Sequence, residues 1–324
     1  MTVTTRIKAE AGKRTRGEFR ALLPLVHAGP TDLLIRYELA GSEGAPLLLI
    51  AGGISAGRHV LANAEDPTDG WWQSQSSSLY HYRLLSIDWI GSDGGLDRPI
   101  DSLDQARAML AALDELRIDR VAAFVGASYG AMVGMHCAAI RPDRVPALLA
   151  ISGAHRSHPF TNAQRALQRQ AVELGERSGS PETGVALARK LAILTYRTAE
   201  EFAQRFNQAL VIEGDRVRAS SEPYLDHMGE KHGARMSAAA YRRLSESIDL
   251  HRIDPATITV PSIFVAVDND QLVPAADIEA LATESPSSRF IRIASLFGHD
   301  AFLKERRAIA MIIGNFLNSL EQSQ

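Results

Sequence analysis

The chain has 324 residues, of which 45% are hydrophobic and 23% charged, and its formal net charge is −3. This balance is typical of a globular protein and argues against a general nucleic-acid or membrane-surface partner, which would need a concentrated basic excess. There is no apolar run of about 18 residues, and residues 1–20 are polar and charged. We therefore expect a cytoplasmic protein. The single cysteine, Cys137, excludes an intramolecular disulfide.

The first part of the chain predicts a lead-in followed by two strands. Residues 1–30 mix charged residues, glycine and proline without sustained periodicity, which indicates a loosely ordered segment with one strand at Phe19–Leu23. The apolar runs Leu33–Leu39 and Leu47–Ile50 lie on either side of a glycine-containing turn. The second run leads into the loop Ala51–Ser55. Its backbone amides are placed to face an anionic oxygen, because loops at the carboxyl ends of core strands commonly contact ligands.

Strands and helices then alternate along the chain. A strand is predicted at Arg83–Ile90, and Ser102 with Gln105 fits a capping box at the start of a helix with regular apolar spacing. Another buried strand is predicted at Ala147–Ser152. Such alternation predicts an α/β protein with a mostly parallel sheet and helices on both faces.

The central motif is a serine between a strand and a helix. The apolar run Val121–Val125 leads directly into Gly126-x-Ser128-x-Gly130, and a helical pattern follows. This arrangement is a nucleophile elbow, in which small flanking residues permit the sharp turn that exposes the serine. A turn that merely contains glycine and serine is the structural alternative. The strand before it, the helix after it, and an acid and a histidine later in the chain favour Ser128 as a nucleophile.

A helical insertion interrupts the sheet. Residues 155–254 contain helical segments and no convincing strand, so we expect an all-helical lid over the catalytic edge. The core is then residues 31–154 and 255–324, with further strands at Pro261–Val267 and Arg289–Ala294 and a closing helix at Ala301–Leu317. The predicted lid helices are Gln164–Leu174, Thr183–Leu194, Glu200–Ala209 and Ala238–Ile248.

A serine nucleophile needs a base, and the base needs an anion that fixes its tautomer. In this topology the order is serine, acid, histidine. His299 is the one histidine after the last predicted core strand, where a loop can reach back to Ser128. Asp268 and Asp270 both follow a strand. We favour Asp270 as the acid, because a carboxylate as near the strand end as Asp268 is often used to stabilise the turn.

The chain resembles the homoserine O-acyltransferases of the α/β-hydrolase superfamily from about Ile35 to its end. The resemblance rests on several separated segments, of which the last two are the most specific. These segments are Gly70–Trp72, Gln168–Ala171, Tyr224–Lys231, Asp270–Pro274 and Gly298–Leu303.

This resemblance implies an acyl transfer from an acyl-coenzyme A to the hydroxyl of L-homoserine through an acyl-serine, in methionine biosynthesis. Acyl-coenzyme A is then a co-substrate, and neither a cofactor nor a metal is expected. The resemblance further implies an oxyanion hole from the backbone N–H groups of Ile54 and Tyr129. It assigns Arg169 to the acceptor's carboxylate and Asp300 to its ammonium, and it suggests a homodimer assembled through the lid.

Two departures concern the acyl pocket. The family usually has Ser-Met-Gly-Gly-Met at the elbow, where this chain has Ser128-Tyr129-Gly130-Ala131-Met132, and its glycine-rich loop is longer than Gly91–Pro99. The identity of the donor, acetyl or succinyl, and that of the acceptor, homoserine or serine, therefore both stay open. A serine esterase or thioesterase with the same triad is the alternative function. A catalytically inactive binding protein is disfavoured, because all three triad candidates are present.

Overall fold

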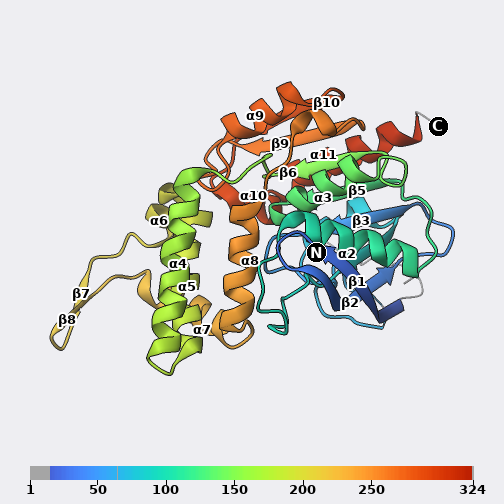
Figure 1. Ribbon diagram of the computed structural model, residues 1–324. Coiled ribbons are helices and arrows are strands. Elements are labelled where there is room, and N and C mark those ends of the chain that lie inside the picture. Colours follow the sequence, from blue (N-terminus) through green and yellow to red (C-terminus); the bar gives the residue numbers. More distant parts are fainter. Residues whose placement is uncertain (1–14, 64, 323–324) are drawn as a thin grey trace.

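The computed structural model describes residues 15–63 and 65–322 of the chain. These residues form a central sheet with the strand order β1-β2-β4-β3-β5-β6-β9-β10 (Figure 1). The pairs β1–β2 and β2–β4 are antiparallel and the other neighbours are parallel, which confirms the predicted mostly parallel sheet. The strands are β1 (Thr15–Leu25), β2 (Gly29–Ala40), β3 (Leu47–Ala51), β4 (Arg83–Ile87), β5 (Ala123–Ala127), β6 (Leu148–Ile151), β9 (Ser262–Val267) and β10 (Ser288–Ile293).

Helices cover both faces of this sheet, as the sequence predicts (Figure 1). Successive side chains of a strand point to opposite faces. On β3, Leu49 packs in the core shared with α2, α3 and α9, whereas Leu48 and Ile50 pack in the core shared with α1 and α11. The predicted closing helix is divided at Glu305 into α10 and α11. These helices are α1 (Ser76–Leu79), α2 (Ser102–Glu115), α3 (Tyr129–Ile140), α9 (Ala275–Glu284), α10 (Ala301–Lys304) and α11 (Arg306–Glu321).

The amino-terminal segment departs from its prediction. β1 pairs with β2 along its whole length, so the loosely ordered lead-in predicted for residues 1–30 is wrong from residue 15 onward, and residues 1–14 lie outside the described part. The predicted strand Phe19–Leu23 is the middle of β1. Charged residues in this edge strand make it difficult to recognise from the sequence. One of them, Arg20, pairs with Asp32 across the ladder at 2.7 Å.

Five helices between β6 and β9 stand together beside the body of the molecule (Figure 1). The four predicted lid helices coincide in place with α4, α5, α6 and α8, whereas α7 was not predicted. In the described part, no helix is both long and apolar enough to cross a membrane. The lid helices are α4 (Pro159–Arg177), α5 (Pro181–Tyr196), α6 (Ala199–Arg205), α7 (Glu222–Gly233) and α8 (Ala238–Leu250).

The lid also contains a small hairpin, so the prediction of an all-helical lid is wrong. β7 (Val211–Glu213) pairs antiparallel with β8 (Arg216–Arg218), and the hairpin protrudes from the lid helices (Figure 1). Its turn contains Gly214 at a φ of 64°, a backbone conformation that glycine adopts without steric cost. The hairpin is only three residues long on each side, which is too short for a clear alternating pattern in the sequence.

The cap of α2 lies one residue before its predicted position. The Asp101 carboxylate accepts the N–H of Asp104 at 3.1 Å, and the Asp104 carboxylate accepts the N–H of Asp101 at 3.1 Å. The predicted cap residues have other partners. Ser102 Oγ bonds to His251. The side-chain amide of Gln105 bonds to the backbone N–H and carbonyl of Ile90, just beyond β4. Tertiary contacts therefore decide which of the adjacent polar residues caps the helix.

Two buried histidines connect α2, α3 and the end of α8. His251 Nε2 lies 2.9 Å from the carbonyl oxygen of Ala154, which can only accept, so this nitrogen donates. Nδ1 is then free to accept the hydroxyl proton of Ser102 at 2.6 Å. Burial lowers the pKa of His251 well below its usual value, and repulsion from the adjacent His136, when that ring is protonated, lowers it further. Burial also lowers the pKa of His136 to about 4. The fold therefore holds both rings in the neutral form.

We predict a loss of stability in mild acid because of these rings. Their pKa values are lower in the folded than in the unfolded protein, so the unfolded chain binds more protons as the pH falls below about 6.5. The free energy of unfolding, measured with urea, should be smaller at pH 5 than at pH 7. His136→Phe should reduce this difference. An unchanged difference in the variant would assign the acid sensitivity to other groups.

Candidate active site

Ser128 lies in a strained turn between β5 and α3. Its backbone has φ 56° and ψ −120°, a conformation that L-residues rarely adopt. The two flanking glycines have steric reasons. A Cβ atom on Gly126 would lie 2.4 Å from the carbonyl oxygen of Gly130, and one on Gly130 would lie 2.2 Å from that of Ala51. The motif read from the sequence therefore has the close backbone contacts that a nucleophile elbow requires.

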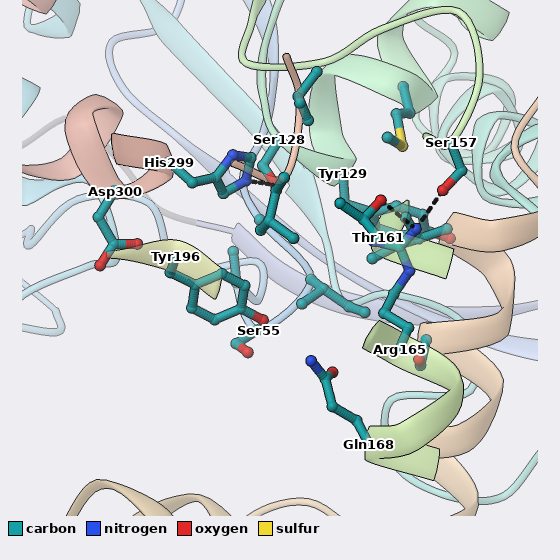
Figure 2. Close-up of a pocket in the computed structure, with 18 of the residues that line it drawn as sticks. Ser55, Ser128, Tyr129, Ser157, Thr161, Arg165, Gln168, Tyr196, His299 and Asp300 are labelled. Carbon is teal, nitrogen blue, oxygen red and sulfur yellow. Dashed lines mark hydrogen bonds between the residues drawn. The ribbon is translucent and has the colours of Figure 1, made fainter. Parts of the chain in front are cut away.

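The three residues predicted as a triad form one hydrogen-bonded chain. Ser128 Oγ lies 2.7 Å from His299 Nε2, and His299 Nδ1 lies 2.7 Å from Asp270 Oδ2 (Figure 2 shows the first contact). A carboxylate accepts, so Nδ1 donates to Asp270 and Nε2 can accept the serine proton. Asp270 Oδ1 accepts the N–H groups of Leu272 and Val273 at 2.9 and 3.0 Å. Hydrogen bonds to both carboxylate oxygens therefore fix the position of Asp270.

Asp268, the other candidate for the acid, points elsewhere. Its carboxylate pairs with Arg292 of β10, and its side chain is 34% exposed. By contrast, Asp270 is 5% exposed. The structure therefore brings Asp270, and not Asp268, to the histidine.

The electrostatic environment of His299 favours a cationic ring. Burial lowers the pKa of His299, but the charge of Asp270 and its hydrogen bond outweigh this effect, and Asp300 adds to them. The net pKa is raised above its usual value of about 6.5. A base that is stabilised as an imidazolium is suited to accept a proton from a hydroxyl.

The predicted oxyanion-hole residues, Ile54 and Tyr129, line the same cavity as Ser128. Tyr129 is the first residue of α3, where a backbone N–H has no acceptor within its own helix. Ile54 lies in a turn closed by a 2.8 Å bond from Ala56 N–H to the carbonyl of Gly53. Both residues border the cavity beside Ser128, and their role in oxyanion binding stays a prediction; the partial positive charge at the start of α3 would favour it.

A cavity of about 230 Å³ lies over the triad and is walled by both the core and the lid (Figure 2). The core contributes Ser128, Ile54 and His299, and α4 and α5 contribute polar side chains such as Gln168 and Tyr196. Within residues 15–63 and 65–322, no cluster of three or more His, Cys, Asp or Glu side chains is arranged to hold a metal ion.

The two predicted substrate-binding residues differ in their placement. Asp300 lines the cavity, and its Oδ2 accepts from Arg197 Nε at 2.7 Å. Arg169 is not among the cavity-lining residues of the described part. Its guanidinium pairs with Asp249 at 2.7 Å and contacts Ser245 Oγ at 3.0 Å. The predicted contact between Arg169 and a substrate in this cavity is therefore not supported by the structure.

Three other lid arginines, Arg156, Arg165 and Arg189, line the cavity and were missed in the sequence. Arg165 lies one helical turn before Arg169 on α4 and lines the cavity. Arg189 of α5 also lines it, with its guanidinium carbon 5.2 Å from the centre of the Tyr196 ring. The buried Nε of Arg189 has no hydrogen-bond partner, and no ion pair of its guanidinium occurs within the described residues. No pattern in the sequence distinguishes these arginines from the other charged residues of the lid helices.

Comparison with known proteins shows the family to which this chain belongs. A family model described as the alpha/beta hydrolase fold matches residues 46–305. The homoserine O-succinyltransferase of Xanthomonas campestris pv. campestris is 47% identical over 98% of this chain and 88% of its own length. The chain belongs to the homoserine O-acyltransferases of the α/β-hydrolase fold.

Other homoserine O-acyltransferases show the same likeness. A homoserine O-acetyltransferase of Thermus thermophilus is 33% identical over 77% of this chain and 72% of its own length. A crystal structure of homoserine O-acetyltransferase from Bacillus anthracis has a TM-score of 0.84, covering 94% of this chain and 98% of that one. At 16% identity, this last comparison supports the fold alone.

In this homoserine O-acyltransferase, Asp270→Asn should slow the acylation of Ser128 by p-nitrophenyl acetate about 10⁴-fold, because the amide favours the wrong histidine tautomer. Asp268→Asn is the matched control and should change the rate only a few-fold, since its partner is Arg292. Stopped-flow release of p-nitrophenolate measures both. A crippled Asp268→Asn beside a mild Asp270→Asn would reverse the assignment of the acid.

Proposed function

We propose that the protein transfers an acyl group from an acyl-coenzyme A to the hydroxyl of L-homoserine, a step of methionine biosynthesis. The observation that carries this proposal is the Ser128–His299–Asp270 hydrogen-bonded chain at a lid-covered cavity, in a chain 47% identical to a homoserine O-succinyltransferase. A plain hydrolase would need the triad but not a group that binds an amino acid. Arg189 is such a group.

The chemistry follows from the triad as two displacements. His299 Nε2 accepts the proton of Ser128 as Oγ attacks the thioester carbonyl carbon. The carbon–sulfur bond breaks, and His299 returns the proton to the coenzyme A sulfur. The acceptor's hydroxyl then gives its proton to His299 and attacks the acyl carbon. The bond from that carbon to Ser128 Oγ breaks, and His299 returns the proton to Oγ. In both steps, the N–H groups of Ile54 and Tyr129 stabilise the negative charge on the carbonyl oxygen.

The acceptor carries an ammonium and a carboxylate, and both need partners in a cavity that excludes water. Asp300 lines the cavity next to His299 in the chain. Its Oδ2 accepts from Arg197, and we retain the carboxylate, which lines the cavity, for the ammonium. For the carboxylate we propose Arg189 in place of Arg169. Arg189 has no acidic partner in the described part of the chain, whereas Arg169 is already paired with Asp249. The planar guanidinium fork suits a carboxylate.

The lid explains why transfer competes with hydrolysis. Water is present at about 55 M, but effective molarities of about 10⁵ M or more are reached when a nucleophile is held in attacking position. Residues of α4, α5 and α8 close the cavity above Ser128. The lid therefore favours a bound alcohol over water as the nucleophile.

Initial rates should give parallel lines in double-reciprocal plots as homoserine is varied at several acyl-coenzyme A concentrations, because the acyl-enzyme forms before the acceptor reacts. Ser128→Ala should retain less than about one part in a thousand of kcat, with thermal melting as the check that it folds. Intersecting lines would show direct transfer in a ternary complex. Thioester hydrolysis that ignores homoserine, and serine as a better acceptor, would each contradict the proposed acceptor.

We also propose that the protein forms a homodimer through its lid. Large apolar side chains are exposed along the two longest lid helices, at Leu167 and Leu174 of α4 and at Leu187 and Leu194 of α5. Each pair is seven residues apart and therefore lies on one face of its helix. The hairpin β7–β8 adds Ile212, which is 78% exposed. A group of exposed apolar side chains on the lid supports a protein–protein interface there.

Sedimentation velocity should give about 70 kDa, twice the 35.2 kDa of one chain. Introducing Leu167→Glu and Leu174→Glu together should yield monomers, because charges would be buried in the interface. These side chains are 60% and 63% exposed, so the change should cost the monomer little stability. Met311→Glu, at a 67% exposed position of α11, is the matched control and should remain dimeric. A monomeric wild type would contradict the proposal.

A further inference from the structure

Arg197 connects the lid to the loop that carries the catalytic base. It directly follows α5, and its Nε pairs with Asp300 Oδ2 at 2.7 Å. Its side chain is only 12% exposed. In the described part of the chain, Asp300 lines the cavity over Ser128 and Arg197 does not. Arg197 is therefore placed to act on a substrate through Asp300.

A second carboxylate fixes the other end of the Arg197 guanidinium. Its Nη1 contacts Oε1 of Glu201 on α6, a residue that is 2% exposed. The start of α6 is itself held in place. Thr198 Oγ1 accepts the N–H of Glu201 at 3.0 Å and donates to the carbonyl of Leu296 at 2.6 Å. The guanidinium thus spans two carboxylates, and both of them fix its orientation.

The charges in this row alternate toward the cavity. Lys304 Nζ lies 3.2 Å from Glu201 Oε1, and Arg205 Nη1 lies 3.4 Å from the same oxygen. Arg197 lies between two anions, Glu201 and Asp300, so only part of its charge is available to offset that of Asp300. Arg197 is the one ion-pair partner of Asp300 among the described residues. Since a carboxylate can accept about four hydrogen bonds, Asp300 can bind an ammonium as well.

The same ion pair fixes the two proposed anchors of the acceptor relative to each other. Arg189, the proposed partner of the carboxylate, lies on α5 with its guanidinium carbon 5.2 Å from the centre of the Tyr196 ring. That ring lies 6.1 Å from the ring of His299 (Figure 2). Arg197 follows Tyr196 in the chain and binds Asp300, the residue after the base. It therefore ties the helix with one anchor to the loop with the other anchor and the base.

We propose that Arg197 is a positioning residue of the acceptor site, which holds Asp300 through Oδ2 and leaves Oδ1 for the acceptor's ammonium. This inference rests on the proposed function and adds a residue to its acceptor site. Arg197 takes no part in the bond changes. A small misplacement of a bound nucleophile can slow its attack strongly, so fixed anchors favour the second displacement. The acylation of Ser128 involves no acceptor and should not depend on Arg197.

The experiment measures the two displacements separately in the wild type, Arg197→Gln and Arg189→Gln. Release of p-nitrophenolate from p-nitrophenyl acetate reports acylation without an acceptor, and transfer to homoserine is followed with acetyl- and succinyl-coenzyme A. Arg197→Gln should lower kcat/KM for homoserine about 10- to 100-fold, the usual effect of losing a hydrogen bond between charged groups. It should change the acylation rate only a few-fold. Arg189→Gln, which removes the proposed carboxylate ligand, should show the same pattern.

Three further variants test whether Arg197 acts through Asp300. Arg205→Gln is the matched control, because Arg205 pairs with Glu201 and not with Asp300, and it should leave kcat/KM for homoserine within a few-fold. Arg197→Lys should recover part of the loss, since lysine keeps the charge but not the planar fork. Added to Asp300→Asn, Arg197→Gln should lower kcat/KM less than about two-fold further, because residues that act as a pair are not additive.

Thermal melting checks that each variant folds, and Arg197→Lys replaces Arg197→Gln in the comparison if the latter does not. Three outcomes would overturn the proposal: an unchanged kcat/KM for homoserine in the Arg197 variant, an equal fall in acylation, and a full effect of Arg197→Gln in Asp300→Asn. The second would show support of the triad, and the third a route other than Asp300. In all three, the wild type still transfers an acyl group to homoserine. A wild type that transfers none from either donor would instead contradict the proposed function.

Discussion

The active site depends on the backbone conformation of Ser128. Its positive φ costs on the order of 1–3 kcal/mol and persists because the surrounding sheet fixes it. The N–H of Ser128 donates to Ile151 of β6 at 2.8 Å, and the N–H of Gly130 donates to Gly52 beyond β3 at 2.8 Å. These bonds connect the turn to strands on both sides. The second bond joins the start of α3 to the loop before Ile54, so the strained turn is connected to both residues that the proposed oxyanion hole uses.

The acid, the base and the lid meet at a second tight position, Gly298. Its φ is 55°, and a Cβ atom there would lie 3.0 Å from the carbonyl of Tyr196 and 3.2 Å from that of Asn269. The loop that carries His299 therefore packs directly on the loop that carries Asp270 and on the end of α5. Arg197, at the end of the same helix, holds Asp300 at 2.7 Å. The core and the lid thus share the residues that organise the triad, which is why the cavity has walls from both.

The sequence predicted the sheet, the elbow and the triad, because each has a local or topological signal. Glycines permit the turn at Ser128, and only one histidine follows the last core strand. The lid arginines had no such signal. Arg165 and Arg169 are one turn apart on a single helix face, and both pair with Asp249 of α8, so the sequence does not tell which of them lines the cavity. The cap of α2 was predicted one residue too late, and β1 over only part of its length, for a related reason, since partners distant in the sequence determine both.

The elbow residue Tyr129, where the family usually has methionine, connects the elbow to the lid through its side chain. Its ring packs on Trp89 with centres 4.9 Å apart, and its buried hydroxyl hydrogen-bonds to Ser247 of α8. Moving α8 away from the elbow would break this buried hydrogen bond, at a cost of about 1–3 kcal/mol. A methionine side chain could not form that hydrogen bond, so breaking it would cost nothing. The residue after the nucleophile therefore also connects the elbow to α8 of the lid.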